Sequence, residues 1–251
     1  MNAPLIAAER WRASLAAWEI PEHIRAAAGE SAWVMPRRFF ARRAERSLAA
    51  PEGPSYLRAR EALQPAGSVL DVGAGGGAAC LPLAAAATRL MAVDSDPLLL
   101  DMLAEAAGRL STPVELVTGR WPDVAGSVPP ADVVVCHHVL YNVPDVGDFV
   151  RELAAHARRR VVIEITGRHP LTVLNPLWWR FHQVSRPEGP TADDALEVLA
   201  ELGIRAGVQR WTRPPTVEVQ ERPDDLVEVT RRRLCLPPGR AGEVADALRS
   251  P

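Results

Sequence analysis

The sequence predicts an α/β fold in which a doubly wound, mostly parallel sheet carries helices on both faces. Three observations lead to this expectation. From residue 68 onward, short β-branched apolar runs alternate with helical segments, as in a right-handed parallel sheet. A glycine-rich turn follows the first of these runs. The chain has 251 residues, of which 47% are apolar, and this is enough to bury one substantial core.

Residues 1–60 precede the first predicted strand and have a helical pattern. Trp11 and Trp18 recur at helical spacing, and Pro21 begins a further short helix. We expect this segment to form a helical cap or lid. An arginine-rich stretch follows at 37–46. A solvated helix face explains these arginines, and a patch that binds an anionic substrate or nucleic acid is the alternative.

The stretch 69–79, VLDVGAGGGAA, is the most informative part of the chain. Residues 69–72 form a short apolar run, typical of a strand that is buried on both faces. The residues of the turn that would approach a ligand are Gly73, Ala74, Gly75 and Gly77. Glycine permits positive φ and a close approach of the backbone. The alanine-rich segment 78–87 is predicted to be a helix whose first N–H groups face the ligand. The stretch therefore predicts a nucleotide site.

A second apolar run, 90–93, ends in Asp94 and is followed by Ser95. A carboxylate at this strand end can accept both hydroxyl groups of an adenosine ribose. Dinucleotide enzymes and enzymes that use S-adenosylmethionine share this feature, and Gly73, Gly75 and Ala78 also fit the relaxed G-x-G-x-x-A form. An ordinary aspartate turn is the alternative for Asp94.

Asp71 separates these two cofactors, because it lies inside the first strand, two positions before the first glycine. A pyrophosphate is negatively charged and disfavours a carboxylate beside its cradle. The sulfonium and α-amino groups of S-adenosylmethionine are cationic and suit one. A carboxylate that braces the loop is the alternative reading of Asp71.

Two segments carry a family resemblance. VLDVGAGGGAA resembles motif I of the class I S-adenosylmethionine-dependent methyltransferases, and AVDSDPLLLDML resembles their acidic second motif. The resemblance is to small-molecule enzymes with a type 11/25-like domain and covers about residues 55–210. It implies a Rossmann-like seven-stranded sheet in the order 3-2-1-4-5-7-6. It also implies S-adenosyl-L-methionine as cofactor, S-adenosyl-L-homocysteine as product, and in-line methyl transfer to a small-molecule acceptor.

The third predicted strand, near 114–117, follows a helix at about 97–109 and leads into Gly119-Arg120-Trp121. Similar methyltransferases place the adenine ring over this loop, and many have an aspartate there. Arg120 departs from that pattern. We therefore expect Arg120 and Trp121 to contact the cofactor, with Trp121 stacking on adenine or packing in the core.

The fourth predicted strand, 132–135, runs into CHHVLYNVP at 136–144. Chemistry in a doubly wound sheet takes place beyond the carboxyl ends of the strands, near the switch in strand order. The segment resembles the corresponding motif of small-molecule methyltransferases and lacks the Asp/Asn-Pro-Pro-Tyr motif of enzymes that methylate nucleic-acid bases. Imidazole titrates near neutral pH, so the catalytic candidates are His138, His137 and Tyr141. We expect His137 to contact the cofactor and His138 or Tyr141 to approach the acceptor; hydrogen-bonded structural histidines are the alternative.

The remaining elements complete the predicted order. A helix that ends in Arg158-Arg159-Arg160 precedes a fifth strand at 161–165, and Thr191 caps a helix that stops at Gly203. A sixth strand is expected near 207–211, and the only candidate for the seventh is 216–219. The predicted division is a cap at 1–60, a core at 61–222 with a lid insertion at about 167–190, and a helical segment at 223–251.

Composition excludes several classes of function. All 29 basic residues are arginine, so lysine Schiff bases, P-loop lysines and Tyr-x-x-x-Lys dehydrogenase sites are absent. Three widely spaced cysteines predict neither a metal site nor a disulfide framework. The net charge of −2 weighs against nucleic acid, and no apolar run approaches the roughly 20 residues that cross a bilayer. We expect a cytoplasmic, bacterial-type enzyme with no membrane partner.

Three alternatives stay open. An NAD(P)-dependent oxidoreductase fits the glycine turn and Asp94 but not Asp71. An RNA-directed methyltransferase, or a noncatalytic S-adenosylmethionine-binding module, could use the arginine clusters at 37–46 and 231–233. Whether the chain is a monomer or a homodimer does not follow from the sequence.

Overall fold

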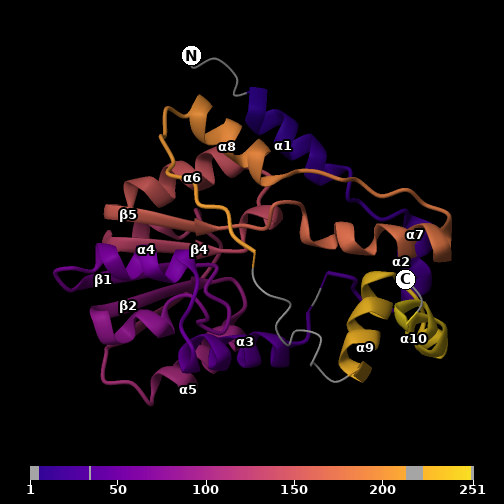
Figure 1. The fold of residues 1–251 in the computed structure, drawn as a ribbon, viewed down its shortest axis with the longest axis horizontal. Coiled ribbons are helices and arrows are strands. Elements are labelled where there is room, and N and C mark those ends of the chain that lie inside the picture. The colour runs from indigo at the N-terminus through magenta and orange to yellow at the C-terminus, as the bar shows by residue number, and fades with distance from the viewer. Residues whose placement is uncertain (1–5, 34, 213–222, 250–251) are drawn as a thin grey trace.

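The computed structural model describes residues 6–33, 35–212 and 223–249. Its centre is a parallel sheet in the order β3-β2-β1-β4-β5 (Figure 1). The strands are β1 (Gly67–Val72), β2 (Ala87–Asp94), β3 (Val114–Thr118), β4 (Ala131–His137) and β5 (Ala157–Glu164). The predicted Rossmann-like α/β fold is therefore confirmed, with the first five strands in the expected order.

The central strand, β1, is buried along its whole length. Val69, Leu70 and Val72 are apolar on both faces, as expected where helices cover a parallel strand from both sides. The strand pairs with β2 on one side and with β4 on the other. Its two neighbours therefore end at the same edge of the sheet as the glycine turn.

Two layers of helices enclose the sheet. One face packs against α1 (Ile6–Ala16), α6 (Val146–Ala155) and α8 (Ala192–Glu201), and the other against α3 (Arg37–Ala49), α4 (Pro54–Ala62) and α5 (Pro97–Ala107) (Figure 1). The start of α8 follows the prediction, because Thr191 accepts from the Asp194 N–H while the Asp194 carboxylate accepts from the Thr191 N–H. Short 3-10 helices complete the core: η1 (Leu81–Ala86), η2 (Ala125–Ser127), η3 (Leu140–Asn142) and η4 (Pro170–Leu174).

The predicted helix at 78–87 is wrong. Residues after the glycines form successive turns and then the 3-10 helix η1. Pro82 has no backbone donor, and the Cys80 N–H donates to the Asp71 carboxylate rather than to a helical carbonyl. Local side-chain bonding thus replaces the α-helical ladder.

The predicted helical end at Arg158–Arg160 is also wrong. Helix α6 stops at Ala155, and the arginines open β5. Strand β5 pairs with β4 at the edge of the described sheet, where the long arginine side chains extend to acidic residues of neighbouring elements. Arg159 lies 3.2 Å from Asp132, and Arg160 lies 2.8 Å from Glu61.

The predicted sixth strand at 207–211 is not a strand, and the seventh lies outside the described residues. Residues 203–212 run without regular structure after α8. Val208 and Trp211 are exposed, and the two residues between them, Gln209 and Arg210, are polar, so the segment has no continuous apolar face to bury.

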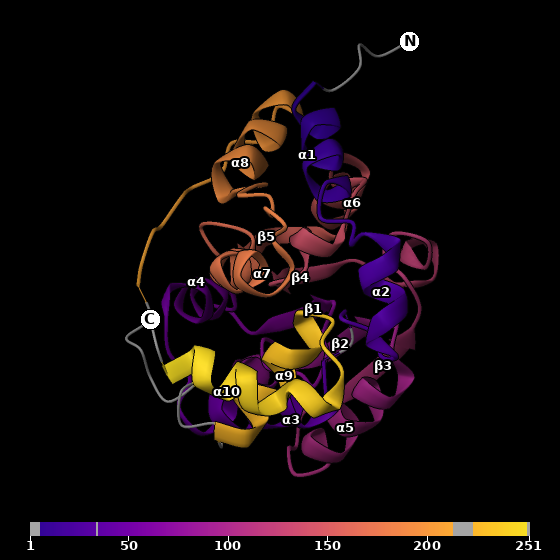
Figure 2. The same ribbon diagram turned by 90° about the vertical axis from the view of Figure 1, so that its right-hand side faces the viewer.

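A small helical cluster lies beside the sheet and joins both ends of the chain. It combines α2 (Glu22–Ala28), α7 (Asn175–His182), α9 (Pro223–Arg233) and α10 (Ala241–Arg249), with η6 (Pro238–Arg240) before the last (Figures 1 and 2). Ile24, Trp178 and Leu234 are buried in its core. No described helix has the length and apolar character needed to cross a membrane.

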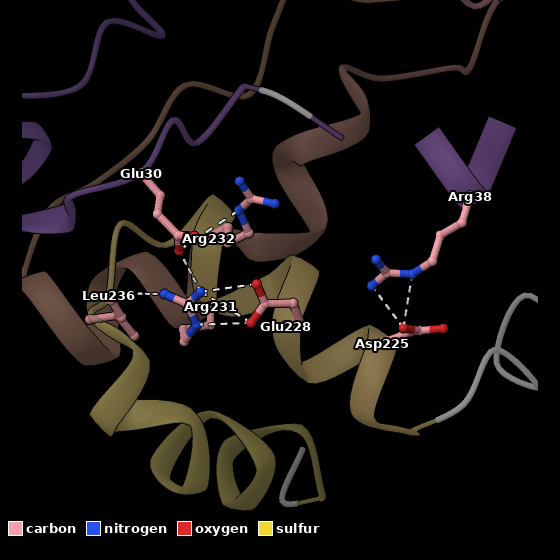
Figure 3. A network of polar contacts seen from close by, with 7 residues as sticks. All are labelled: Glu30, Arg38, Asp225, Glu228, Arg231, Arg232 and Leu236. Atoms are coloured by element: carbon pink, nitrogen blue, oxygen red, sulfur yellow. Dashed lines mark hydrogen bonds and ion pairs between the residues drawn. The ribbon is translucent and has the colours of Figure 1, made fainter. Parts of the chain in front are cut away.

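Ionic contacts attach this cluster to the N-terminal segment (Figure 3). The Arg231 side chain is only 3% exposed and donates to Glu30 at 2.6 Å, to Glu228 at 3.0 Å and to the Leu236 carbonyl at 2.5 Å. At the other end of α9, Asp225 accepts from Arg38 at 2.8 Å and from Arg42 at 2.9 Å. Helix α3 is thereby held by the C-terminal segment.

We predict that Arg231→Ala lowers the free energy of unfolding by about 2–3 kcal/mol, because it leaves two carboxylates and a carbonyl without their buried donor. Urea denaturation followed by circular dichroism measures the loss. Arg249→Ala is the control, since Arg249 pairs with Asp246 on the surface and such pairs contribute about 0–1 kcal/mol. Equal losses in the two variants would contradict the prediction.

Candidate functional site

A cavity of about 900 Å³ opens at the carboxyl edge of the sheet. This volume lies near the top of the roughly 300–1,000 Å³ range of small-molecule sites. The glycine turn, the end of β2, the loop after β4 and helix α3 form its walls. Predicted site residues in the wall are Asp71, Gly73, Ala74, Gly75, Asp94, Ser95, Arg120, Trp121, His137 and His138.

Two glycines of the turn require positive φ at the cavity wall. Gly73 has φ 73° and Gly75 has φ 53°. A Cβ at Gly73 would lie 2.4 Å from Val139 Cγ2, so only glycine fits between the turn and the loop after β4. Gly77 does not line the cavity: at φ 88° it packs against Leu81, where a Cβ would lie 2.7 Å from Cγ.

The Asp94 carboxylate lies where β2 ends and accepts two backbone N–H groups. Gly75 donates to one oxygen at 2.8 Å, and Asp96 donates to the other at 2.9 Å. Asp94 thus ties the glycine turn to the start of α5, and the exposed Ser95 lies beside it in the cavity wall.

The Asp71 carboxyl group is buried in the floor of the cavity, with a residue exposure of 1%. Burial raises its pKa to about 7, against the opposing effect of a hydrogen bond from Cys80. The Cys80 N–H donates to it at 3.2 Å, so the loop-bracing contact is present. Asp94 raises the pKa of Asp71 further. A cation placed in the cavity would favour the ionised carboxylate.

Arg120 and Trp121 follow β3 and both line the cavity. Arg120 is exposed, whereas Trp121 is buried in the core on one face of the sheet. The indole meets the His156 ring edge-on at 4.8 Å between centroids, and its Nε1–H has no hydrogen-bond partner among the described residues. Trp121 therefore combines core packing with a place in the cavity wall.

The two histidines occupy the end of β4. His137 pairs in register with Glu164 on β5, and its Nδ1 lies 3.9 Å from the Glu164 carboxylate. His138 adopts the left-handed conformation, with φ 61°. Its backbone N–H donates to the Glu164 carbonyl at 2.7 Å, and its Nε2 lies 2.9 Å from Glu164 Oε1. Both side chains line the cavity.

Glu164 lines the cavity and Ser55 contacts it, and neither belongs to the predicted set of site residues. The second oxygen of Glu164 accepts from the Ser55 hydroxyl, at the start of α4. Burial would raise the pKa of Glu164, but the hydrogen bonds from His138 and Ser55 and the charge of His137 hold it well below its usual range. Glu164 could have been found from its position near the carboxyl end of the predicted fifth strand. No local sequence pattern indicates that Ser55 lies near the site.

Tyr141 does not line the cavity. Its hydroxyl donates to the Thr166 carbonyl at 2.6 Å, and its ring stacks on Trp11 at 5.7 Å. Burial raises the pKa of Tyr141 to about 12. The hydrophobic contact with α1 draws this side chain away from the acceptor position that the sequence suggested.

Helix α3 supplies the cavity wall from outside the sheet. Phe40 lies against the turn: a Cβ at Gly75 would be 3.2 Å from its ring, and one at Gly76 would be 3.0 Å from its carbonyl oxygen. Arg43, Arg46 and Tyr56 of α3 and α4 also line the cavity. None of the described residues 167–190 does so.

The residues present suit S-adenosylmethionine. The glycine cradle has no room for side chains at Gly73, the buried Asp71 favours a cationic partner, and Asp94 supplies paired carboxylate oxygens. When bound, this cofactor would supply an activated methyl group.

One family model matches the part of the chain that forms the sheet. Residues 70–163 match the family model described as "Methyltransferase domain". Among solved structures, the chain is similar to magnesium protoporphyrin IX methyltransferase of Synechocystis with bound S-adenosylhomocysteine: 20% identity, 66% of this chain and 87% of that chain covered, TM-score 0.47.

A TehB-like S-adenosylmethionine-dependent methyltransferase of Corynebacterium glutamicum shows 18% identity, with 66% of this chain and 82% of that chain covered and a TM-score of 0.45. Both TM-scores lie below 0.5, so these likenesses carry no functional argument. The search of curated proteins found no match. The part of the chain that forms the parallel sheet is therefore similar to a methyltransferase domain, and the residues of its cavity suit S-adenosylmethionine.

Proposed function

We propose that this protein transfers the methyl group of S-adenosylmethionine to a small-molecule acceptor. One observation supports this most directly: the glycine turn, Asp71, Asp94 and the His138–Glu164 pair all line a single cavity at the carboxyl edge of the sheet. Methyl transfer from a sulfonium is an in-line displacement, so placing both reactants in one cavity supplies much of the rate.

Each cofactor contact follows from chemistry and position. Asp71 receives the cationic methionine end, and Asp94 with Ser95 accepts the ribose hydroxyls. The backbone of the turn at Gly73, Ala74 and Gly75 approaches the cofactor closely. Trp121 stacks on adenine while Arg120 covers it from the exposed side, and His137 contacts the methionine moiety. The position of Gly77 supports a packing role behind the turn.

On the acceptor side, His138 is the group best placed to take a proton, since its ring lines the cavity. Tyr141 contributes through packing, because its hydroxyl is bonded to Thr166. Helix α3, with Phe40 against the turn, forms the part of the N-terminal cap that covers the cofactor.

The ion pairs weigh against RNA as the partner. Arg38 and Arg42 both bind Asp225, and Arg231 is buried between Glu30 and Glu228. Asp225 thus offsets part of the charge of the two α3 arginines, and Arg231 is enclosed by carboxylates instead of facing phosphate groups. The family match opposes the oxidoreductase alternative.

Calorimetric titration with S-adenosylhomocysteine tests the cofactor site. We expect saturable binding with one ligand per chain and no fluorescence change with NADH. Absence of binding at high micromolar S-adenosylhomocysteine would refute the proposed function.

Asp94→Ala should weaken S-adenosylhomocysteine binding about 10- to 100-fold, because hydrogen bonds to a charged group contribute roughly 1.5–3 kcal/mol. Asp101→Ala is the matched control, since Asp101 lies exposed on α5 outside the cavity. Thermal unfolding of each free variant checks that the fold is kept. An unchanged affinity in Asp94→Ala would place the ribose elsewhere.

Cofactor binding should also depend on pH through Asp71. Its carboxyl group is protonated below about pH 7 in the free protein, and the ligand's ammonium group favours the ionised form. Binding therefore releases a proton, and affinity falls as pH drops below about 7. The neighbouring thiols of Cys80 and Cys136 stay neutral, because burial raises the pKa of each well above its usual value.

Calorimetry between pH 5.5 and 7.5, in buffers of different ionisation enthalpy, measures this proton release. In Asp71→Asn the pH dependence from this group should disappear and binding at pH 7.5 should weaken. The same pH dependence in both proteins would remove Asp71 from the cationic end of the ligand.

A further inference from the structure

A hydrogen-bonded relay that crosses three elements reaches the cavity wall at Glu164 and His138. Ser55 on α4 donates to one oxygen of Glu164 on β5, and the other oxygen lies 2.9 Å from His138 Nε2, directly after β4. The Glu164 and His138 side chains are 13% and 25% exposed. The carboxylate is thus enclosed, while the imidazole reaches the cavity.

The backbone of His138 is held in a conformation that non-glycine residues rarely adopt. Its φ of 61° is fixed by the bond from its own N–H to the Glu164 carbonyl at 2.7 Å. The same glutamate therefore holds both the backbone and the ring of His138. Such strain persists only where the surroundings impose it, and it is frequent at active sites.

The charge of Glu164 decides which ring nitrogen of His138 carries the proton. An ionised carboxylate only accepts hydrogen bonds, and His138 and Ser55 together hold the pKa of Glu164 below its usual range. His138 Nε2 must then be the donor, which leaves Nδ1 of the neutral ring as the proton acceptor. His137 also lies near the carboxylate, with its Nδ1 at 3.9 Å.

We propose that Glu164, braced by Ser55, is a positioning residue that sets His138 as a general base, and that the methyl acceptor is a phenolic hydroxyl. This inference rests on the proposed methyl transfer and adds the acceptor class to it. His138 is the catalytic residue, and Glu164 and Ser55 act through it.

The acceptor class follows from matching proton affinities. A carboxylic acid, with a pKa of about 4, is already ionised at neutral pH and needs no base. A thiol at about 8.5 ionises with little help, whereas an aliphatic hydroxyl, close to water at about 15.7, lies far beyond an imidazole. A phenol, at about 10, lies within reach of an imidazole base. Phe40, Tyr56 and Phe149 in the cavity wall suit a flat aromatic ring.

The acceptor oxygen forms the new bond to the methyl carbon while the carbon–sulfur bond breaks and its electron pair stays on sulfur. The hydroxyl proton moves to His138 Nδ1. The resulting imidazolium is stabilised by the Glu164 carboxylate and later releases the proton to solvent.

The first test uses long-range ¹H–¹⁵N NMR on the full chain at pH 8, which distinguishes the two tautomers without any substrate. Wild-type His138 should carry its proton on Nε2. Glu164→Gln should give a mixture of tautomers, because the amide can donate as well as accept. Glu152→Gln is the control: it changes the pair with His156, at 3.6 Å and outside the cavity. An unchanged tautomer in Glu164→Gln would overturn the positioning role.

The second test offers methyl-labelled S-adenosylmethionine with phenol, thiophenol, benzoate and benzyl alcohol, and with their naphthalene counterparts. We expect label on the phenol and naphthol alone. His138→Asn should reduce that transfer about 10²- to 10⁴-fold, the usual contribution of a general base. Asparagine tolerates the left-handed backbone, so this variant keeps the turn. Glu164→Gln should reduce transfer by at least about tenfold and move the acidic limb of the pH–rate profile, and Ser55→Ala should cause a smaller loss.

Titration of the wild type and every variant with S-adenosylhomocysteine distinguishes failure of the proposed methyl transfer from failure of the proposed base and acceptor class. Failure of the wild type to bind refutes the methyltransferase function itself. Binding with no label on any phenol, with label on benzoate or thiophenol instead, or with transfer unaffected in His138→Asn overturns the acceptor class or the base while leaving the proposed function standing.

Discussion

The parallel pairing of β1 between β2 and β4 is the constraint on which the whole site depends. Because the three strands run the same way, Asp71, Asp94 and His137 reach one edge of the sheet from positions far apart in the chain. The β4–β5 register then places His137 opposite Glu164. Shifting any strand by one residue would turn its side chains to the other face and separate these groups.

Much of this edge could be predicted from the sequence, for a physical reason. Buried parallel strands are continuous apolar runs, so 69–72, 90–93 and 132–135 were recognisable locally, and the carboxyl-edge rule placed the loops after them together. The three arginines at 158–160 led to the wrong prediction of a helix end, because the same pattern also suits the start of an edge strand. The α-helix predicted after Gly77 does not form there, because the Cys80 N–H donates to the Asp71 carboxylate instead of to a helical carbonyl.

Contacts between distant side chains could not be predicted, because local periodicity carries no information about them. Ser55 and Glu164 are separated by 109 positions, and Glu30 and Arg231 by 201. Tyr141 shows the same limit: its spacing placed it near the acceptor, but stacking on Trp11 decided its direction. The described residues therefore support a site that combines predictable strand ends with unpredictable partners from α3, α4 and β5.

The attachment of α3 to α9 bears on the order in which the molecule assembles. Arg38 and Asp225 are separated by 187 positions, so this ion pair closes an exceptionally long loop. All five described strands of the sheet lie within residues 67–164, which are synthesised before α9. Helix α3 is synthesised before the glycine turn that it covers, but its ionic anchor to Asp225 forms only after α9 has been synthesised.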